Sequence, residues 1–163
     1  MNGSPKIVAS AALISLLASA AAAQSIVMQK TLSLGLAKTI ADAALAECKS
    51  KGFNTSVVVV DRAGQVLVML RDEAASAQTA EMARRKAFTA RMFRTSTLEF
   101  QKRTQDPTYA AQRDVADILA LGGGVPIQIG NEVIGGVASS GSSQPQDDAC
   151  ARAGIEKVAA LLK

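Results

Sequence analysis

Four consecutive valines, Val57–Val60, place the strongest constraint on how this 163-residue chain folds. β-Branched side chains favour extended backbone, and an unbroken apolar run indicates a strand that is buried on both faces. The next residues, Asp61-Arg62-Ala63-Gly64, are typical of a tight turn, because aspartate can bond its own backbone and glycine permits a positive φ. Gln65–Arg71 then returns as a second strand, so the sequence predicts a β-hairpin.

A second hairpin is expected further along the chain, where Ile127–Gly130 and Val133–Ala138 are apolar runs separated by Asn131-Glu132. Two residues between such runs indicate a tight connection between antiparallel strands. The glycine-rich segment before this hairpin, Gly122–Pro126, and the Ser- and Gly-rich residues 139–144 after it are expected to be loops.

Small and apolar residues recur at steps of three and four and predict several helices. The predicted ranges are Ser33–Lys51, Thr79–Phe93, Ser96 to about Arg103, and Gln146–Leu162. Ser33 and Ser96 can cap their helices, Gly52 ends the first one, and polar residues 104–112 are expected to be a loop. The prediction is an α+β fold in a single domain: an antiparallel β-sheet of two hairpins, with about four to five strands, packed with roughly three to five helices.

Residues 1–23 have the features of a secretory signal peptide. Lys6 is the positive residue, Ile7–Ala22 is apolar, and Ala21-Ala22-Ala23 has the small residues of a cleavage site, so we expect cleavage before Gln24. The alternative is a membrane anchor, but the apolar run is about 16 residues, shorter than the roughly 20 that cross a bilayer. We therefore expect a domain of residues 24–163 that is periplasmic or secreted, with no stable membrane span after processing.

The chain has two cysteines, Cys48 and Cys150. An even number of cysteines in a chain expected to reach an oxidising compartment indicates a disulfide. Two buried thiols, or a thiolate that ligates a metal, are the alternatives.

The chain has no histidine, which excludes much familiar chemistry. A Ser-His-Asp triad, a histidine-ligated zinc and an imidazole proton shuttle cannot be built. Two cysteines also cannot hold an iron–sulfur cluster or a four-thiolate zinc within one chain.

The formal net charge is +4, and basic residues concentrate in residues 79–103. A basic patch attracts nucleic acid, anionic lipid or small acidic ligands, and the alternative is a solvated helix face. Nucleic acid is not expected, because only 3% of residues are aromatic and the chain carries an export signal. We therefore expect a small acidic ligand as partner.

Two features can bind such a ligand. The backbone N–H groups of Gly122, Gly123 and Gly124 can point at an anion, although a flexible turn is the simpler interpretation. Lys86 falls on a largely apolar helix face, from which it either extends to solvent or binds a carboxylate in a pocket, with Thr89 nearby. Arg71, at the end of the second predicted strand, can join it as a bidentate partner or remain a solvated strand end.

Carboxylates and metal-ligating groups are weaker candidates. Asp61 and Asp147 are candidate bases for an enzyme that acts on a small carboxylate or hydroxy acid, but a turn role for Asp61 and helix capping for Asp147 are the favoured interpretations. No paired-carboxylate signature is present, so no catalytic residue is assigned. Tyr109, Met82 and Met92 are weak candidates for iron ligands, and methionine at helical spacing more often fills a core.

The motifs together resemble, in order, those of the GlcG/HbpS family of haem-binding proteins. The resemblance covers roughly residues 32–162 and rests on the VVD-x-x-G hairpin at Val57–Gly64, the K-A-[YF]-T-A helix at Lys86–Ala90, the G-G-G-[VL]-P loop at Gly122–Pro126, the V-[IV]-G-[AG]-[IV]-x-x-S-G strand from Val133 to Gly141, and the Q-D-x-A helix opening at Gln146–Ala149.

The resemblance implies an antiparallel sheet flanked by helices, assembly into homo-oligomers, and binding of haem or related small acidic ligands in some members. Lys86, Thr89, Gly122–Gly124, Gly141 and Asp147 fall on the family's motif positions. Because histidine is absent, haem iron would need a tyrosine, methionine, lysine or thiolate ligand, or the ligand would be held by its carboxylates alone. The sequence thus predicts an exported haem- or tetrapyrrole-binding protein; the alternatives are an enzyme or binding protein for a small carboxylate, and a structural oligomeric module that binds a protein partner.

Overall fold

The structure is a computed structural model that describes residues 26–163, so the predicted signal peptide lies outside the described residues. A four-stranded antiparallel sheet is flanked by helices, which confirms the predicted single-domain α+β fold. The strands are β1 (Ser56–Val60), β2 (Val66–Arg71), β3 (Gly124–Ile129) and β4 (Glu132–Ser140). The helices are α1 (Leu34–Ser50), α2 (Gln78–Phe93), α3 (Thr97–Arg103), α4 (Pro107–Ala110) and α5 (Gln144–Glu156), with short 3-10 helices η1 (Ala111–Asp114) and η2 (Ala159–Leu161).

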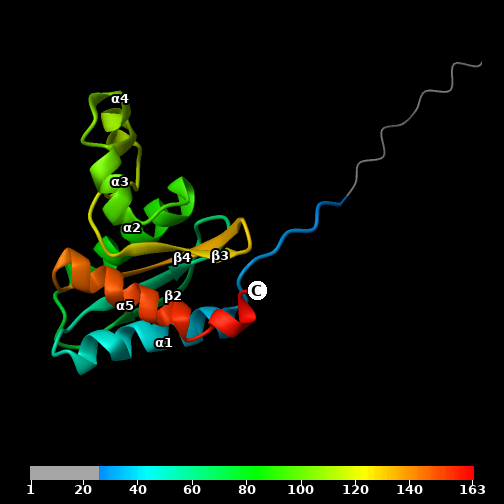
Figure 1. Ribbon diagram of the computed structural model, residues 1–163. Helices are drawn as coiled ribbons and strands as arrows, with labels where there is room; N and C mark the ends of the chain where they lie inside the picture. Colours follow the sequence, from blue (N-terminus) through cyan, green and yellow to red (C-terminus); the bar gives the residue numbers. More distant parts are fainter. Residues whose placement is uncertain (1–25) are drawn as a thin grey trace, which may run out of the picture.

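The sheet has the strand order β2-β1-β4-β3, so the valine strand β1 is central. Helices α1 and α5 lie side by side on one face, and α2 covers the other (Figure 1). Val57 and Val59 pack in the core with α1 and α5, whereas Val58 and Val60 pack against α2. This alternation is the reason that an unbroken valine run is buried on both faces.

Helix α2 lies close to the sheet because it presents alanines to a glycine of β4. Ala83 and Ala87 are fully buried against β1 and β4. A Cβ atom added at Gly136 would collide with the carbonyl oxygen of Ala87, so only glycine permits this approach. Helices α3 and α4 extend from the far end of α2 as an arm that leaves the layers (Figure 1).

Several predicted boundaries need correction. The loop predicted at residues 104–112 contains α4 and part of η1, because Asp106 accepts a hydrogen bond from the N–H of Thr108 at 2.8 Å and Pro107 suits a first helical turn. The predicted loop at residues 139–144 was wrong at its start: β4 extends through Ser139 and Ser140, which are buried. Strand β3 begins at Gly124, inside the predicted glycine loop.

The last helix also differs from its predicted range. It begins at Gln144, two residues earlier than predicted, and gives way to η2 after Glu156. No helix within residues 26–163 is long and apolar enough to cross a membrane.

Cys48 and Cys150 form a disulfide, as predicted, and both are fully buried. Their Cα atoms lie 5.5 Å apart, and the bond joins the last turn of α1 to the first half of α5 across a separation of 102 residues. The covalent bond thus fixes the two neighbouring helices of one layer.

Replacing both cysteines by alanine should lower the free energy of unfolding by about 4–5 kcal/mol, because the unfolded chain regains the entropy of a long open loop. Urea unfolding followed by circular dichroism measures this loss. A reducing agent should destabilise the parent protein to the same extent and leave the double variant unchanged; equal stability of the two proteins without reductant would contradict the prediction.

Candidate functional site

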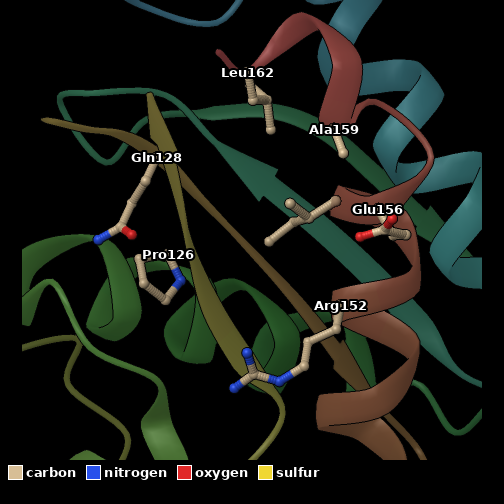
Figure 2. A pocket seen from close by; sticks show the side chains of 7 residues that line it. Pro126, Gln128, Arg152, Glu156, Ala159 and Leu162 are labelled. Atoms are coloured by element: carbon tan, nitrogen blue, oxygen red, sulfur yellow. The ribbon is translucent and has the colours of Figure 1, made fainter. Parts of the chain in front are cut away.

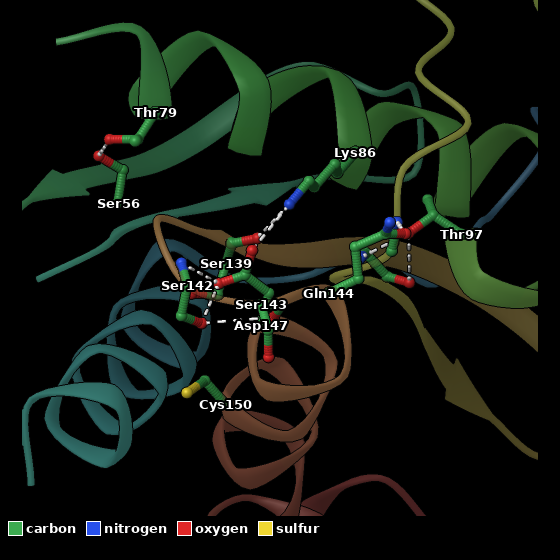
Figure 3. A network of polar contacts seen from close by, with 12 residues as sticks. Ser56, Thr79, Lys86, Thr97, Ser139, Ser142, Ser143, Gln144, Asp147 and Cys150 are labelled. Carbon is green, nitrogen blue, oxygen red and sulfur yellow. Dashed lines mark hydrogen bonds and ion pairs between the residues drawn. The ribbon is translucent and has the colours of Figure 1, made fainter. Parts of the chain in front are cut away.

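Lys86 is buried in an ion pair at the junction of α2, β4 and α5. Only 1% of the residue is exposed, and its Nζ donates to Oδ2 of Asp147 at 2.9 Å and to the carbonyl oxygen of Ser139 at 3.2 Å (Figure 3). The interpretation that Lys86 extends to solvent was therefore wrong. Burial lowers the pKa of Lys86, and the negative charge of Asp147 opposes that effect.

Both carboxylate oxygens of Asp147 accept hydrogen bonds, Oδ2 from Lys86 and Oδ1 from the residue two positions before the start of α5. Its Oδ1 accepts from both the hydroxyl and the backbone N–H of Ser142, at 2.7 and 3.1 Å. The carboxylate is 2% exposed and lies in the first turn of α5. Helix capping alone does not account for it, because the residue bonds a lysine from the opposite layer.

The triple glycine lies directly against this pair, and the protein itself already uses most of its backbone N–H groups. The N–H of Gly122 donates to Oε1 of Gln144, and that of Gly124 donates to Oγ1 of Thr97, both at 2.8 Å. Gly123 has a φ of 124°, and a Cβ added there would lie 3.0 Å from Nζ of Lys86. The glycines thus allow close packing, and two of the three amides are already bonded.

The other predicted ligand-binding residues do not meet Lys86 in one open site. Thr89 is fully buried, donates to the carbonyl of Arg85 and accepts from the N–H of Leu119. Arg71 donates to the backbone carbonyls of Asp72 and Ala75.

Gly141 and Asp61 have local roles in the backbone. Gly141 has a φ of 139°, where a Cβ would lie 2.6 Å from the carbonyl oxygen of Asn54. Oδ1 of Asp61 accepts from the N–H groups of Ala63 and Gln65, as a turn residue does. Asp61 follows the end of β1 that is remote from Ser139 and Lys86. A role for these residues in ligand binding stays a prediction.

The weak iron-ligand candidates are on separate parts of the surface. Tyr109 is 42% exposed on the α3–α4 arm, where the guanidinium of Arg103 lies 5.8 Å from its ring centroid. Met92 is 48% exposed on α2, and Met82 is partly buried on the same helix. Within residues 26–163 no three histidine, cysteine, aspartate or glutamate side chains gather in a way that could hold a metal ion.

An open hollow of about 430 Å³ lies between the edge strand β3 and helix α5. Its lining residues are Pro126, Gln128, Arg152, Ile155, Glu156, Ala159 and Leu162. Arg152 reaches from α5 toward the strand (Figure 2), and its Nε donates to Oδ2 of Asp148 at 2.6 Å. This hollow was not predicted from the sequence, because Arg152 and Ile155 have the pattern of ordinary exposed and buried residues of an amphipathic helix.

Comparison with known proteins identifies the family. The sequence profile of the family described as "Haem degrading protein HbpS-like" matches residues 32–156. The chain belongs to the HbpS-like family. This HbpS-like chain is 33% identical over 131 residues to an uncharacterized 15.0 kDa protein from the dhaT-dhaS intergenic region of Citrobacter freundii, which covers 77% of the chain and 91% of that protein.

Solved structures of similar proteins have the same fold as this HbpS-like chain. A double mutant of HbpS from Streptomyces reticuli matches with a TM-score of 0.78 and 31% identity, over 93% of this chain and 97% of that one. A further structure of HbpS matches with a TM-score of 0.76 and 36% identity, over 83% of this chain and 94% of that one. The complex of PduOC with heme matches with a TM-score of 0.70 and 26% identity, over 77% of this chain and 94% of that chain.

The Lys86–Asp147 pair should behave as a structural element of this HbpS-like chain. Asp147→Asn should lower the free energy of unfolding by about 3–5 kcal/mol, because it leaves a buried ammonium without its counter-charge. The double variant Lys86→Met, Asp147→Asn should be more stable than Asp147→Asn alone. Urea unfolding measures both.

The exposed i,i+4 pair of Lys38 with Asp42, at 3.0 Å, offers a matched control. Asp42→Asn should cost less than about 1 kcal/mol, since exposed ion pairs contribute little. Equal losses for Asp42→Asn and Asp147→Asn would show that the buried pair has no special structural weight.

Proposed function

We propose that this protein binds haem or a related tetrapyrrole. The single observation that carries the proposal is the match of the HbpS-like family across residues 32–156. The similarity to the complex of PduOC with heme supports it. Binding is favoured over acid–base catalysis on a small carboxylate because Lys86 is enclosed and Asp61 lies at the other end of β1.

The hollow between β3 and α5 suits the ring and one acidic side chain of a tetrapyrrole. Pro126, Ile155 and Leu162 supply apolar walls, and its volume of about 430 Å³ lies in the range of ligand pockets. Within residues 26–163, Asp148 pairs with Arg152 through Nε alone, and the Arg152 side chain is 57% exposed, so its outer guanidinium nitrogens are available to a ligand. A guanidinium binds a carboxylate through two parallel hydrogen bonds.

The donor groups of this hollow fit the ring and the carboxylate better than they fit iron. Its lining residues within the described chain include no sulfur atom and no phenol, and the sequence has no imidazole. Haem iron in proteins is commonly held by histidine, cysteine, methionine or tyrosine. The expected role of Arg152 and the apolar walls is therefore to hold and orient the ring, independently of the metal at its centre.

Addition of haemin to the purified protein should produce a saturable Soret shift, and iron-free protoporphyrin IX should bind with an affinity within about threefold of haemin. Arg152→Gln should weaken both ligands about tenfold, or roughly 1.4 kcal/mol, because a charge-assisted pair is lost. Lys157→Gln makes the same charge change just after α5, outside the hollow, and should leave both affinities unchanged.

Three results would contradict this proposal or its site. Haemin spectra identical to those with an unrelated basic protein would remove haem binding. Binding of haemin without protoporphyrin would indicate iron ligation, which Met92→Leu and Tyr109→Phe would then localise. A Soret band that forms and bleaches with reductant present would indicate degradation in place of stable binding.

We also propose that the mature protein is a periplasmic or secreted homo-oligomer. A buried disulfide is typical of oxidising compartments, which agrees with the signal-peptide pattern of residues 1–23. Native mass spectrometry of exported protein should give subunits that begin at Gln24, are two hydrogens lighter than the reduced chain, and associate. Subunits that retain residues 1–23, or a stable monomer at micromolar concentration, would contradict this.

A further inference from the structure

A second hollow, of about 440 Å³, lies at the end of the sheet where the β1–β2 turn meets the segment before α1 and helix α2. Its lining residues are Gln29, Thr31, Asp61, Arg62, Ala63 and Arg91. None of them belongs to the Lys86–Asp147 pair or to the hollow between β3 and α5. Two guanidinium groups thus face one small open space.

Arg91 has no structural partner that explains its position. Its Nε is buried and has no hydrogen-bond partner within residues 26–163, and no ion pair there includes it. The close approach of α2 to Gly136 places its Cβ against the sheet: a Cβ at Gly136 would lie 3.3 Å from that of Arg91. Burial lowers the pKa of Arg91, and the positive charges of Arg62 and Arg94 add to this effect.

The nearby carboxylates form hydrogen bonds or ion pairs with groups other than Arg91. The negative charge of Asp61 partly opposes the lowering of the Arg91 pKa. Oδ1 of Asp61 accepts hydrogen bonds from two backbone N–H groups of its own turn. Glu132 accepts from Nη1 of Arg62 at 3.0 Å and lies 3.9 Å from Nζ of Lys30. Because Nε itself is buried, an external acceptor would bind the outer nitrogens of Arg91, which forms no ion pair within residues 26–163.

We propose that Arg91 and Arg62 bind an oxyanion of a small organic acid, a carboxylate or a phosphate ester, in this hollow. The guanidinium of Arg91 presents a fork that matches either group, and Arg62 adds a second positive charge. Thr31 and Gln29 line the same space, and a hydroxyl and a side-chain amide are groups that can donate to further oxygens of the ligand. The site is separate from the proposed tetrapyrrole site.

Isothermal titration of the purified processed protein with malonate, glycerol 3-phosphate and inorganic phosphate tests this, with ionic strength held constant by sodium chloride. We expect saturable binding, with one site per chain, of at least one organic probe. Preference for malonate assigns a carboxylate ligand, and preference for glycerol 3-phosphate assigns a phosphate ester.

Variants distinguish a built site from general charge attraction. Arg91→Gln should weaken binding at least tenfold, and Arg91→Lys should also lose most of it, because a lysine keeps the charge but not the fork. Arg94→Gln is the matched control: it removes the same charge at an exposed position at the end of α2, outside the hollow, and should change affinity by less than twofold.

Far-ultraviolet circular dichroism establishes that each variant is folded. The proposal is overturned if no probe binds saturably to the parent protein, or if Arg91→Gln and Arg94→Gln weaken binding equally. Haemin titration of Arg91→Gln separates the two proposals. If the variant no longer binds the anion probes but still gives the Soret shift of the parent protein, the substitution has affected this hollow and not the proposed tetrapyrrole site.

Discussion

The buried ion pair between Lys86 and Asp147 is the interaction on which the arrangement of layers depends. It joins α2, on one face of the sheet, to the start of α5, which packs on the other face, and its third member is a carbonyl of β4. Such a pair is stable only when every charged atom has a partner, and here Ser142 and Ser139 supply the remaining ones. The pair also requires glycine at position 123, because a Cβ atom there would lie only 2.6 Å from the carbonyl oxygen of Ser139 and 2.7 Å from Cβ of Asp147.

The Lys86–Asp147 pair leaves no open site between the layers at that point, and the two hollows described above lie at the margins of the sheet. The edge strand β3 borders one hollow and the β1–β2 turn borders the other. Each has an arginine whose guanidinium is incompletely paired by the protein. Recognition of acidic groups is thus expected around the rim, while Lys86 and the triple glycine hold the helices and the sheet together.

Local signals were sufficient for most of the elements. Ser33 caps α1 and Ser96 caps α3 through the expected N–H groups, and the valine run forms the central strand, because each depends on neighbours in sequence. The burial of Lys86 in an ion pair could not be predicted from its neighbours in sequence, because its partner Asp147 lies 61 residues further along the chain. Ser139 and Ser140 were misjudged for a related reason, because distant elements bury them and composition alone favours a loop. Ser139 faces α1 and α5, where its hydroxyl lies 3.5 Å from Sγ of Cys48, whereas Ser140 pairs with Ser56 on the face that α2 covers. Arg91 was predicted only as one member of the basic cluster of residues 79–103, and Arg152 carried no sequence signal beyond helix amphipathicity.

The disulfide and the ion pair both hold the same part of α5, since Cys150 comes one turn after Asp147. The opposite end of the helix has neither restraint, and it continues into η2, whose Leu161 is 69% exposed. Ala159 and Leu162, which flank that end, form one wall of the hollow beside β3. That hollow is therefore bordered at one end by a covalently fixed part of α5 and at the other by a part that is held by packing, with Val158 buried in the core. A local loosening of that second part would leave the disulfide-linked half of α5 in place.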